Sequence, residues 1–471
     1  MKKIIVLILL AGWGRLPAEP AWQFEDYFID QTLRIDYDHT GTALQDIYAF
    51  DEAYLEPYWA GSRTHLIDTL DLGAYLFTVQ DHPTRTLLYS RGFCSIFGEW
   101  RTTEEARTRS RSFSESLRFP MPKREVRITI HARDRNNRFQ EVWSLDLDPS
   151  APEIIRTDFF RDVTVRTLMH HGPSDKKVDL LILPDGYTGH EIKKFIGDAK
   201  RMTRILFDTS PFREHKTDFN VRVIEAPSAD SGIDDPAKGV YRDNILSSSF
   251  NSFGSDRYIL SYDNKTIRKL ASRAPYDFLY ILVNSEKYGG GGIFNLYATC
   301  IPDNLWSDYI FVHEFGHLFA GLGDEYYTSD VAYAEFYPRD VEPWEPNITA
   351  LLDPDALKWK SLVDPDTPIP TPWDKSVFDS ANAAYQRQRL EIPAGSRRDS
   401  LGLAHQRWIH EFNRTRPYWG RVGAFEGSGY ASEGLYRPSI DCRMFSRSQT
   451  GFDPVCTRAI IRVIRFYTGS R

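Results

Sequence analysis

Three residues, His313, Glu314 and His317, follow one another in the spacing H-E-x-x-H. On a helix, residues four apart lie one turn apart on the same face, so both imidazoles can reach one metal ion. Glu314 follows the first ligand and can take a proton from a metal-bound water that attacks a carbonyl, and later pass a proton to the leaving amine. Zinc suits such a site because it accepts neutral imidazole nitrogen and carboxylate oxygen and keeps one position open for water. The pattern therefore predicts a zinc-dependent hydrolase.

Two carboxylates follow this helix closely. Gly321 and Gly323 are expected to end the helix and to turn the chain back toward the histidines. Asp324 is then the predicted third zinc ligand and Glu325 the alternative, while a third interpretation makes both of them solvated acids after a helix end. An apolar face should bury the helix, made of Val312, Phe315 and Phe319.

At this point the sequence resembles the IgA peptidase (M64) family of metallopeptidases, which is metzincin-like. The first half resembles the β-sandwich domain that precedes the peptidase domain in many members. The resemblance implies an α+β multidomain chain, in which an antiparallel β-sandwich is followed by an α/β metzincin-like zinc peptidase domain. The matching segments are His313–Tyr326, Tyr288–Ile293, Glu426–Tyr430 and Tyr436–Pro438.

The comparison with metzincins leaves some roles open. Metzincins usually carry H-E-x-x-H-x-x-G-x-x-H, whereas here the glycine comes one residue later, at Gly321, and Asp324 stands where a third His is expected. Met444 is the candidate for the methionine turn beneath the metal, with ordinary core packing as the alternative. Tyr430 and Tyr436 could stabilise the oxyanion of a tetrahedral intermediate, or simply pack in the core.

A run of glycines, Gly289–Gly292, lies upstream of the helix. It lacks the G-K-[ST] ending of a phosphate-binding loop, so that function is excluded. By resemblance, the run leads to a cleft-edge strand around Ile293–Thr299, on which a substrate peptide would lie in extended form. A flexible surface hairpin is the alternative. The candidate substrate-cleft residues are Gly290, Gly291, Gly292 and Ile293.

Short β-type runs alternate with turn signals from Trp22 to about Pro149. In Glu125–His131, apolar and polar residues alternate, as in a strand with one solvated face. An antiparallel β-sandwich domain over residues 22–155 is therefore expected, with the polar stretch Thr102–Ser114 as a loop or a short exposed helix. Similar runs are Tyr75–Val79, Thr86–Tyr89 and Val142–Leu147.

A different pattern begins near Val178. Val178–Leu183 predicts a buried strand, Glu191–Phe207 an amphipathic helix, and Phe219–Ile224 and Phe278–Val283 further strands, at the spacing of βαβ units. The peptidase domain is assigned to residues 156–471, with the boundary in Ser150–His171. Two segments rich in Pro and Trp, 342–346 and 368–372, are expected to wall a cleft.

Composition supports a globular protein. Of 471 residues, 41% are hydrophobic, which argues against disorder, and the net charge of −7 is spread along the chain without a basic stripe, so no nucleic-acid partner is expected. Four cysteines are too few for a disulfide scaffold. Cys442 and Cys456 are close enough in sequence to bridge, whereas Cys94 and Cys300 are expected to be buried thiols.

The N-terminus predicts export. Lys2 and Lys3 precede the apolar run Ile4–Ala11, so residues 1–21 are interpreted as a signal peptide; a membrane anchor is the alternative, but the run is well below the ~20 residues of a spanning helix. The mature protein is expected to be secreted, periplasmic or at the cell surface, without a transmembrane anchor.

The sequence therefore favours a secreted zinc-dependent endopeptidase whose substrate is a protein or peptide. One alternative is a binding or adhesion protein that keeps a peptidase fold without cleaving. A second is a zinc hydrolase of a non-peptide amide. Specificity for IgA is not implied, because substrate choice depends on the walls of the cleft.

Overall fold

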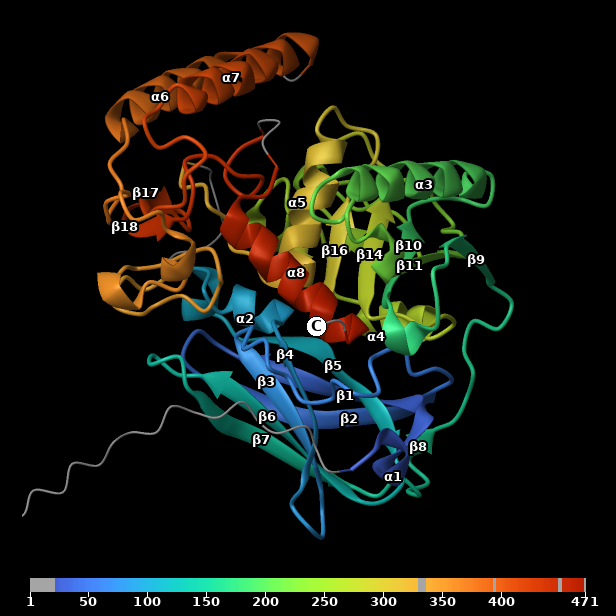
Figure 1. The fold of residues 1–471 in the computed structure, drawn as a ribbon. Coiled ribbons are helices and arrows are strands. Elements are labelled where there is room, and N and C mark those ends of the chain that lie inside the picture. Colours follow the sequence, from blue (N-terminus) through green and yellow to red (C-terminus); the bar gives the residue numbers. More distant parts are fainter. Residues whose placement is uncertain (1–21, 329–335, 393–394, 448–450, 470–471) are drawn as a thin grey trace, which may run out of the picture.

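The computed structural model describes residues 22–328, 336–392, 395–447 and 451–469, and the predicted signal peptide lies outside these residues. The N-terminal part consists mostly of strands, which form two four-stranded sheets (Figure 1). The orders are β5-β1-β2-β8 and β4-β3-β6-β7. The strands are β1 (Phe28–Gly41), β2 (Asp46–Glu56), β3 (Tyr75–Asp81), β4 (Leu87–Phe93), β5 (Arg111–Pro122), β6 (Val126–Arg133), β7 (Phe139–Leu147) and β8 (Ile154–Ile155).

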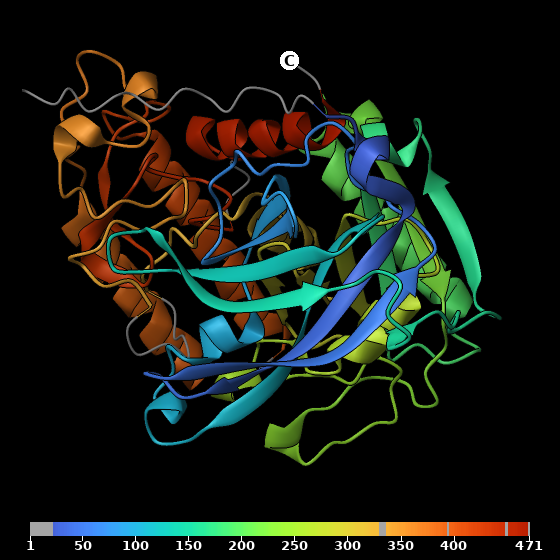
Figure 2. The same ribbon diagram turned by 90° about the horizontal axis from the view of Figure 1, so that it is seen from below.

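The two N-terminal sheets share one apolar core, to which Ile35 and Phe119 contribute from one sheet and Phe77 and Ile128 from the other. All pairings are antiparallel except the short parallel contact between β2 and β8. Figure 2 shows these strands from below, where they cross the underside of the molecule. The prediction of a loop or exposed helix over Thr102–Ser114 was partly wrong, since β5 already begins at Arg111.

A six-stranded sheet forms the centre of the remainder, in the order β15-β16-β14-β10-β11-β9. The four inner strands are parallel, and each edge strand is antiparallel to its neighbour. The predicted strands and βαβ spacing are confirmed here. The strands are β9 (Thr164–Met169), β10 (Val178–Asp185), β11 (Phe219–Glu225), β14 (Phe278–Val283), β15 (Gly290–Ile293) and β16 (Tyr297–Cys300).

Helices cover both faces of this sheet because successive side chains of a strand point to opposite sides. Leu180 and Ile182 of β10 pack in one core with α3 (Ile192–Asp208), α5 (Ser307–Ala320) and α8 (Pro454–Thr468). Leu181 and Leu183 pack in a second core with α4 (Asn264–Ala271) and with α2 (Ile96–Trp100) of the N-terminal part. The N-terminal part is thus packed directly onto the central sheet.

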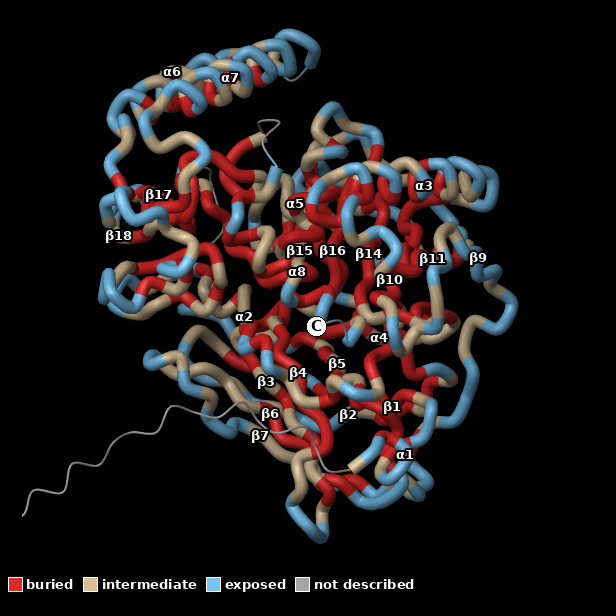
Figure 3. The backbone as a smooth tube through the Cα atoms, viewed as in Figure 1, coloured by how far each residue is buried: buried red, intermediate tan, exposed pale blue. Residues whose placement is uncertain are grey.

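The remaining elements lie around this body. Helices α6 (Lys375–Glu391) and α7 (Ser396–Arg414) pack on each other through the stacked rings of Tyr385 and His405, and Figure 3 shows them largely exposed while the central strands are buried. No helix among the described residues is long and apolar enough to cross a bilayer. The short elements are α1 (Phe24–Tyr27), β12 (Ser248–Ser249), β13 (Leu260–Ser261), β17 (Phe425–Ser428) and β18 (Ala431–Arg437).

Candidate metal centre

Helix α5 carries His313, Glu314 and His317, and its end is fixed by a glycine cap. Gly321 adopts the left-handed conformation, with φ of 58°, and its N–H donates to the carbonyl of His317. The bond to His317 is that of an αL cap, and the N–H of Leu322 donates to the carbonyl of Gly316. The chain reverses at this cap and returns along the helix, as predicted from the glycines.

The two imidazoles are oriented by main-chain carbonyls. His313 Nδ1 lies 3.1 Å from the carbonyl oxygen of Arg443, and His317 Nδ1 lies 2.5 Å from that of Leu322. A carbonyl oxygen can only accept, so in each neutral ring Nδ1 carries the proton and Nε2 is left with a free lone pair. The two Nε2 atoms converge, 3.1 Å apart. This is the tautomer that two metal-binding histidines require.

Asp324 completes the group. Its Oδ1 lies 3.0 Å from Nε2 of His313 and 3.2 Å from Nε2 of His317. Ligand atoms at about 2.0–2.1 Å from a tetrahedral zinc ion are separated by about 3.3 Å, so the three atoms fit one ion closely. The other oxygen, Oδ2, accepts a hydrogen bond of 2.6 Å from the hydroxyl of Tyr430. The donor set, with one position open toward the cleft, is therefore suited to a catalytic metal.

The electrostatics of this group favour a shared cation. Burial by itself would raise the pKa of Asp324, but His317 and His313 outweigh burial and hold that pKa well below its usual range. Burial lowers the pKa of His317, but the charge of Asp324 prevails and raises it to about 9. Burial raises the pKa of Glu314. Without a metal, His317 thus holds a proton that a metal ion would displace.

The centre opens into a cleft of about 170 Å³. Glu314 and β15 line one side, and Trp344 and Glu345 of the Pro- and Trp-rich segment 342–346 line another, as expected for that segment. Segment 368–372 does not line this cleft; its Thr371 pairs instead with Phe425 of β17. The N-terminal part also contributes to the wall, with Ala74, Tyr75, Cys94, Ser95, Gly98 and Glu99.

Two protein-family models match this chain. The model of IgA Peptidase M64 matches residues 167–464, and the model of the Peptidase M64 N-terminus matches residues 23–144. The chain belongs to the IgA Peptidase M64 family. It is therefore a member of a metallopeptidase family, whose substrates are proteins or peptides. No curated protein matches the chain significantly.

In this M64 chain the glycine run is itself the edge strand β15, so the edge strand begins earlier than the predicted Ile293–Thr299. That predicted range includes the turn between β15 and β16. Glycines are needed here because the strand lies very close to α5. A Cβ at Gly292 would lie 2.5 Å from the carbonyl oxygen of Glu314, and one at Gly290 would lie 2.7 Å from Ile310. The strand can thus lie directly against the metal-binding helix.

The other predicted site residues are spread more widely. Met444 is buried, and its sulfur lies where a Cβ on Gly316 of α5 would approach to 3.1 Å, so it packs beneath the helix. Tyr430 lines the cleft, whereas Tyr436 lies in β18 and does not. Glu325 does not accompany Asp324; it belongs to a second group with Cys442, Asp453 and Cys456.

Two further residues to which the sequence assigned no role reach the cleft. The Tyr326 ring is stacked on that of His313 with centroids 6.3 Å apart, and the Arg257 guanidinium lies 6.0 Å from the Tyr326 ring. Arg257 lies in the irregular segment before β13, where no motif marks it. Tyr326 directly follows the two carboxylates and ends the segment His313–Tyr326 that resembles the family, which is the signal that could have indicated it.

Proposed function

We propose that the chain is a secreted zinc-dependent endopeptidase of the M64 family, with His313, His317 and Asp324 as zinc ligands and Glu314 as the general base. The observation that carries the proposal is the convergence of three ligand atoms, at 3.0, 3.1 and 3.2 Å from one another, beside a carboxylate in a cleft. The zinc ion would supply a Lewis acid that polarises the scissile carbonyl and acidifies a water molecule.

The protein's own groups would move the protons. Glu314 lies in the cleft next to the ligands, where its carboxylate can accept a proton from the attacking water and then donate it to the leaving amine nitrogen. Its raised pKa, caused by burial, favours this second role, since a stronger base gives a conjugate acid that persists at higher pH. Arg257 and Tyr326 face the same space and are candidates to donate hydrogen bonds to the oxyanion.

A substrate peptide would lie along β15 as an added strand. The segment 257–259 already pairs with Gly290, through Gly290 N–H to the Arg257 carbonyl and Ile259 N–H to the Gly290 carbonyl. We therefore propose that substrate pairs beyond Gly290, along Gly291, Gly292 and Ile293. The N-terminal part would act as a β-sandwich domain over residues 22–155 that selects substrate through its wall of the cleft.

The metzincin-like arrangement is also a proposal. Met444 packs under α5 at Gly316, and the carbonyl of the preceding residue, Arg443, holds His313. This is the supporting role expected of a methionine turn. Residues 1–21 would direct export to the periplasm, the cell surface or the medium and then be removed.

The test measures zinc content and cleavage of a mixed library of proteins and peptides. The wild type should hold zinc and cut, whereas Glu314→Gln should keep zinc and lose about 10²–10⁴-fold or more in rate. Glu286→Gln is the control, because Glu286 is exposed and does not line the cleft. A folded wild-type protein that binds no metal would contradict the assignment of His313, His317 and Asp324 as zinc ligands.

Two other outcomes would change the proposal in defined ways. Zinc with cleavage of non-peptide amides alone would identify a different hydrolase. Zinc with no cleavage of any compound, while Glu314→Gln leaves every measured property unchanged, would favour a binding protein built on the peptidase fold.

A further inference from the structure

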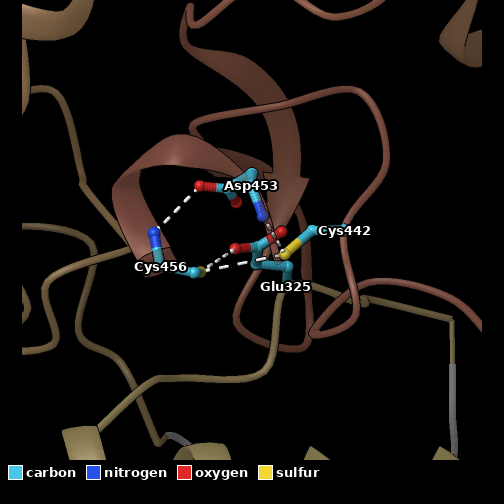
Figure 4. Close-up of side chains that lie close together, drawn as sticks. All are labelled: Glu325, Cys442, Asp453 and Cys456. Atoms are coloured by element: carbon cyan, nitrogen blue, oxygen red, sulfur yellow. Dashed lines mark hydrogen bonds between the residues drawn. The ribbon is translucent and has the colours of Figure 1, made fainter. Parts of the chain in front are cut away.

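A second group of metal-ligating side chains lies apart from the histidines (Figure 4). Glu325 comes from the loop after α5, Cys442 from the segment before Met444, and Asp453 and Cys456 from the start of α8. Their ligand atoms all lie within 4.8 Å of one another, and each of the four residues is at most 5% exposed. Three segments of the chain thus bring two carboxylates and two thiols to one buried point.

Hydrogen bonding explains only part of this group. Asp453 caps α8 with Oδ1, which accepts from the N–H groups of Val455 and Cys456, and Glu325 Oε1 accepts from the amide of Asn347. The second oxygens, Glu325 Oε2 and Asp453 Oδ2, accept no hydrogen bond from the described residues. Buried carboxylate oxygens without a partner are costly, and a bound cation is one way to satisfy them.

The charges around these two carboxylates also favour a bound cation. Arg437 is the cation that acts on Glu325, yet its guanidinium donates to the main-chain carbonyls of Glu426, Gly427 and Ile440. Among the described residues, the buried carboxyl groups of Glu325 and Asp453 therefore have no ion-pair partner. A divalent cation bound between them would supply one.

The distances match a tetrahedral thiolate site. Two sulfurs bound at about 2.3 Å to one tetrahedral zinc ion lie about 3.8 Å apart, and a bound sulfur and oxygen about 3.5 Å apart. The Cys442 and Cys456 sulfurs are 3.8 Å apart, and Cys456 Sγ is 3.3 Å from Glu325 Oε1. A disulfide requires about 2.05 Å, and both cysteines are free. The N–H of Asp453 donates to Cys442 Sγ, a contact that favours the thiolate.

We propose that Glu325, Cys442, Asp453 and Cys456 bind a second metal ion, a thiophilic divalent cation such as zinc, in a closed structural site. Four protein ligands with no exposed position leave no place for substrate, which is the mark of a structural site. The site would fasten the loop that carries Asp324 to the segment whose Arg443 carbonyl orients His313. This inference is independent of whether the first site is catalytic.

The test loads the metal-free full-length chain with Co²⁺, because a thiolate bound to Co²⁺ gives an intense near-ultraviolet charge-transfer band that histidine and carboxylate ligands do not give. We expect about two Co²⁺ ions per chain and this band in the wild type. The pair His313→Ala and His317→Ala should remove one equivalent and keep the band. Cys442→Ser with Cys456→Ser should remove the band, whereas Cys300→Ser, at a similarly buried cysteine outside both metal groups, should keep it.

The proposal is overturned if folded wild-type protein, in the reduced state, binds Co²⁺ without the thiolate band. It is also overturned if the natively purified chain, denatured without reductant, exposes two thiols in place of four, since Cys442 and Cys456 would then form a disulfide. These two measurements use the wild type and the histidine variants only. They decide the question even where the double cysteine variant does not fold.

Discussion

Asp324 and Glu325 are neighbours in the chain, yet their carboxylates belong to two different groups. Asp324 Oδ1 lies 3.0 Å from Nε2 of His313, whereas Glu325 Oε1 lies 3.3 Å from the sulfur of Cys456. The N–H of Glu325 donates to the carbonyl of Met444, which anchors the loop between the two groups. The segment 441–444 thus supports both, through Cys442 on one side and the Arg443 carbonyl on the other.

Asp324→Asn should weaken metal binding at the histidines and reduce cleavage sharply, because the amide carries no charge. In the metal-free protein, the pKa of His317 should fall from about 9 toward its ordinary value, since Asp324 is what raises it. An NMR titration of the imidazole checks this. Asp308→Asn, an exposed acid on the same helix, is the control. A His317 pKa unchanged in Asp324→Asn would contradict the assignment.

Tyr430→Phe tests a positioning role. The hydroxyl of Tyr430 donates to Asp324 Oδ2 at 2.6 Å, and such supporting bonds typically contribute 10–100-fold to metal affinity. We expect zinc affinity to fall by about that factor while the thermal unfolding midpoint of the metal-free protein changes little. Competition with a chelator measures the affinity. Tyr436→Phe, outside the cleft, should leave it unchanged; equal losses in both variants would argue against a specific role.

Gly292→Ala tests the close approach of β15 to α5. The added Cβ would meet the Glu314 carbonyl oxygen at 2.5 Å, so the strand must move away from the helix. We expect a loss of about 1–3 kcal/mol in stability and a drop in kcat/KM of about 10-fold or more. Gly189→Ala is a matched control, because nothing lies within 4 Å of its Cβ position. Wild-type kinetics in Gly292→Ala would show that the strand has room to adapt.

Sequence patterns predicted the elements whose signals are local. Phe278–Val283 is a continuous apolar run and Val178–Leu183 is broken only by Asp179, and both became central strands because only a sheet covered on both faces buries such runs. The start of β5 was missed because Arg111, Ser112 and Ser114 conceal the alternation around the buried Phe113. Polar residues on a solvated face look like a loop until the partner strand is known.

The residues of the candidate metal centre also separate into those that local rules predict and those that tertiary contacts place. His313 and His317 meet because four-residue spacing on a helix is a local rule. The choice between Asp324 and Glu325 depended on the direction of the loop after Gly321, which is held by contacts with Met444 and Asn347 far along the chain. Arg257 reaches the cleft only through the packing of its segment on β15. Such tertiary placements carry no signature in one sequence.

Glu345 should make stability depend on pH. It lines the cleft at 3% exposure, and burial raises its pKa to about 7. Between its unfolded value near 4.5 and about 7, the folded state binds more protons than the unfolded state. The contribution of neutral Glu345 to stability is therefore fully present below pH 4.5 and is lost as pH rises through 7, by up to about 3 kcal/mol.

Glu345→Gln should remove this loss of stability, because the amide stays neutral. Its oxygen can still accept the hydrogen bond that the Tyr337 hydroxyl donates to Glu345 Oε1 at 3.0 Å in the wild type. The measurement compares thermal unfolding midpoints of wild type and variant at pH 5 and pH 8. The midpoints should be similar at pH 5, and the variant should be the more stable protein at pH 8. Glu433→Gln, at an exposed position, should follow the wild type at both pH values. A parallel pH dependence in Glu345→Gln and wild type would mean that Glu345 is ionised in the folded protein throughout this range.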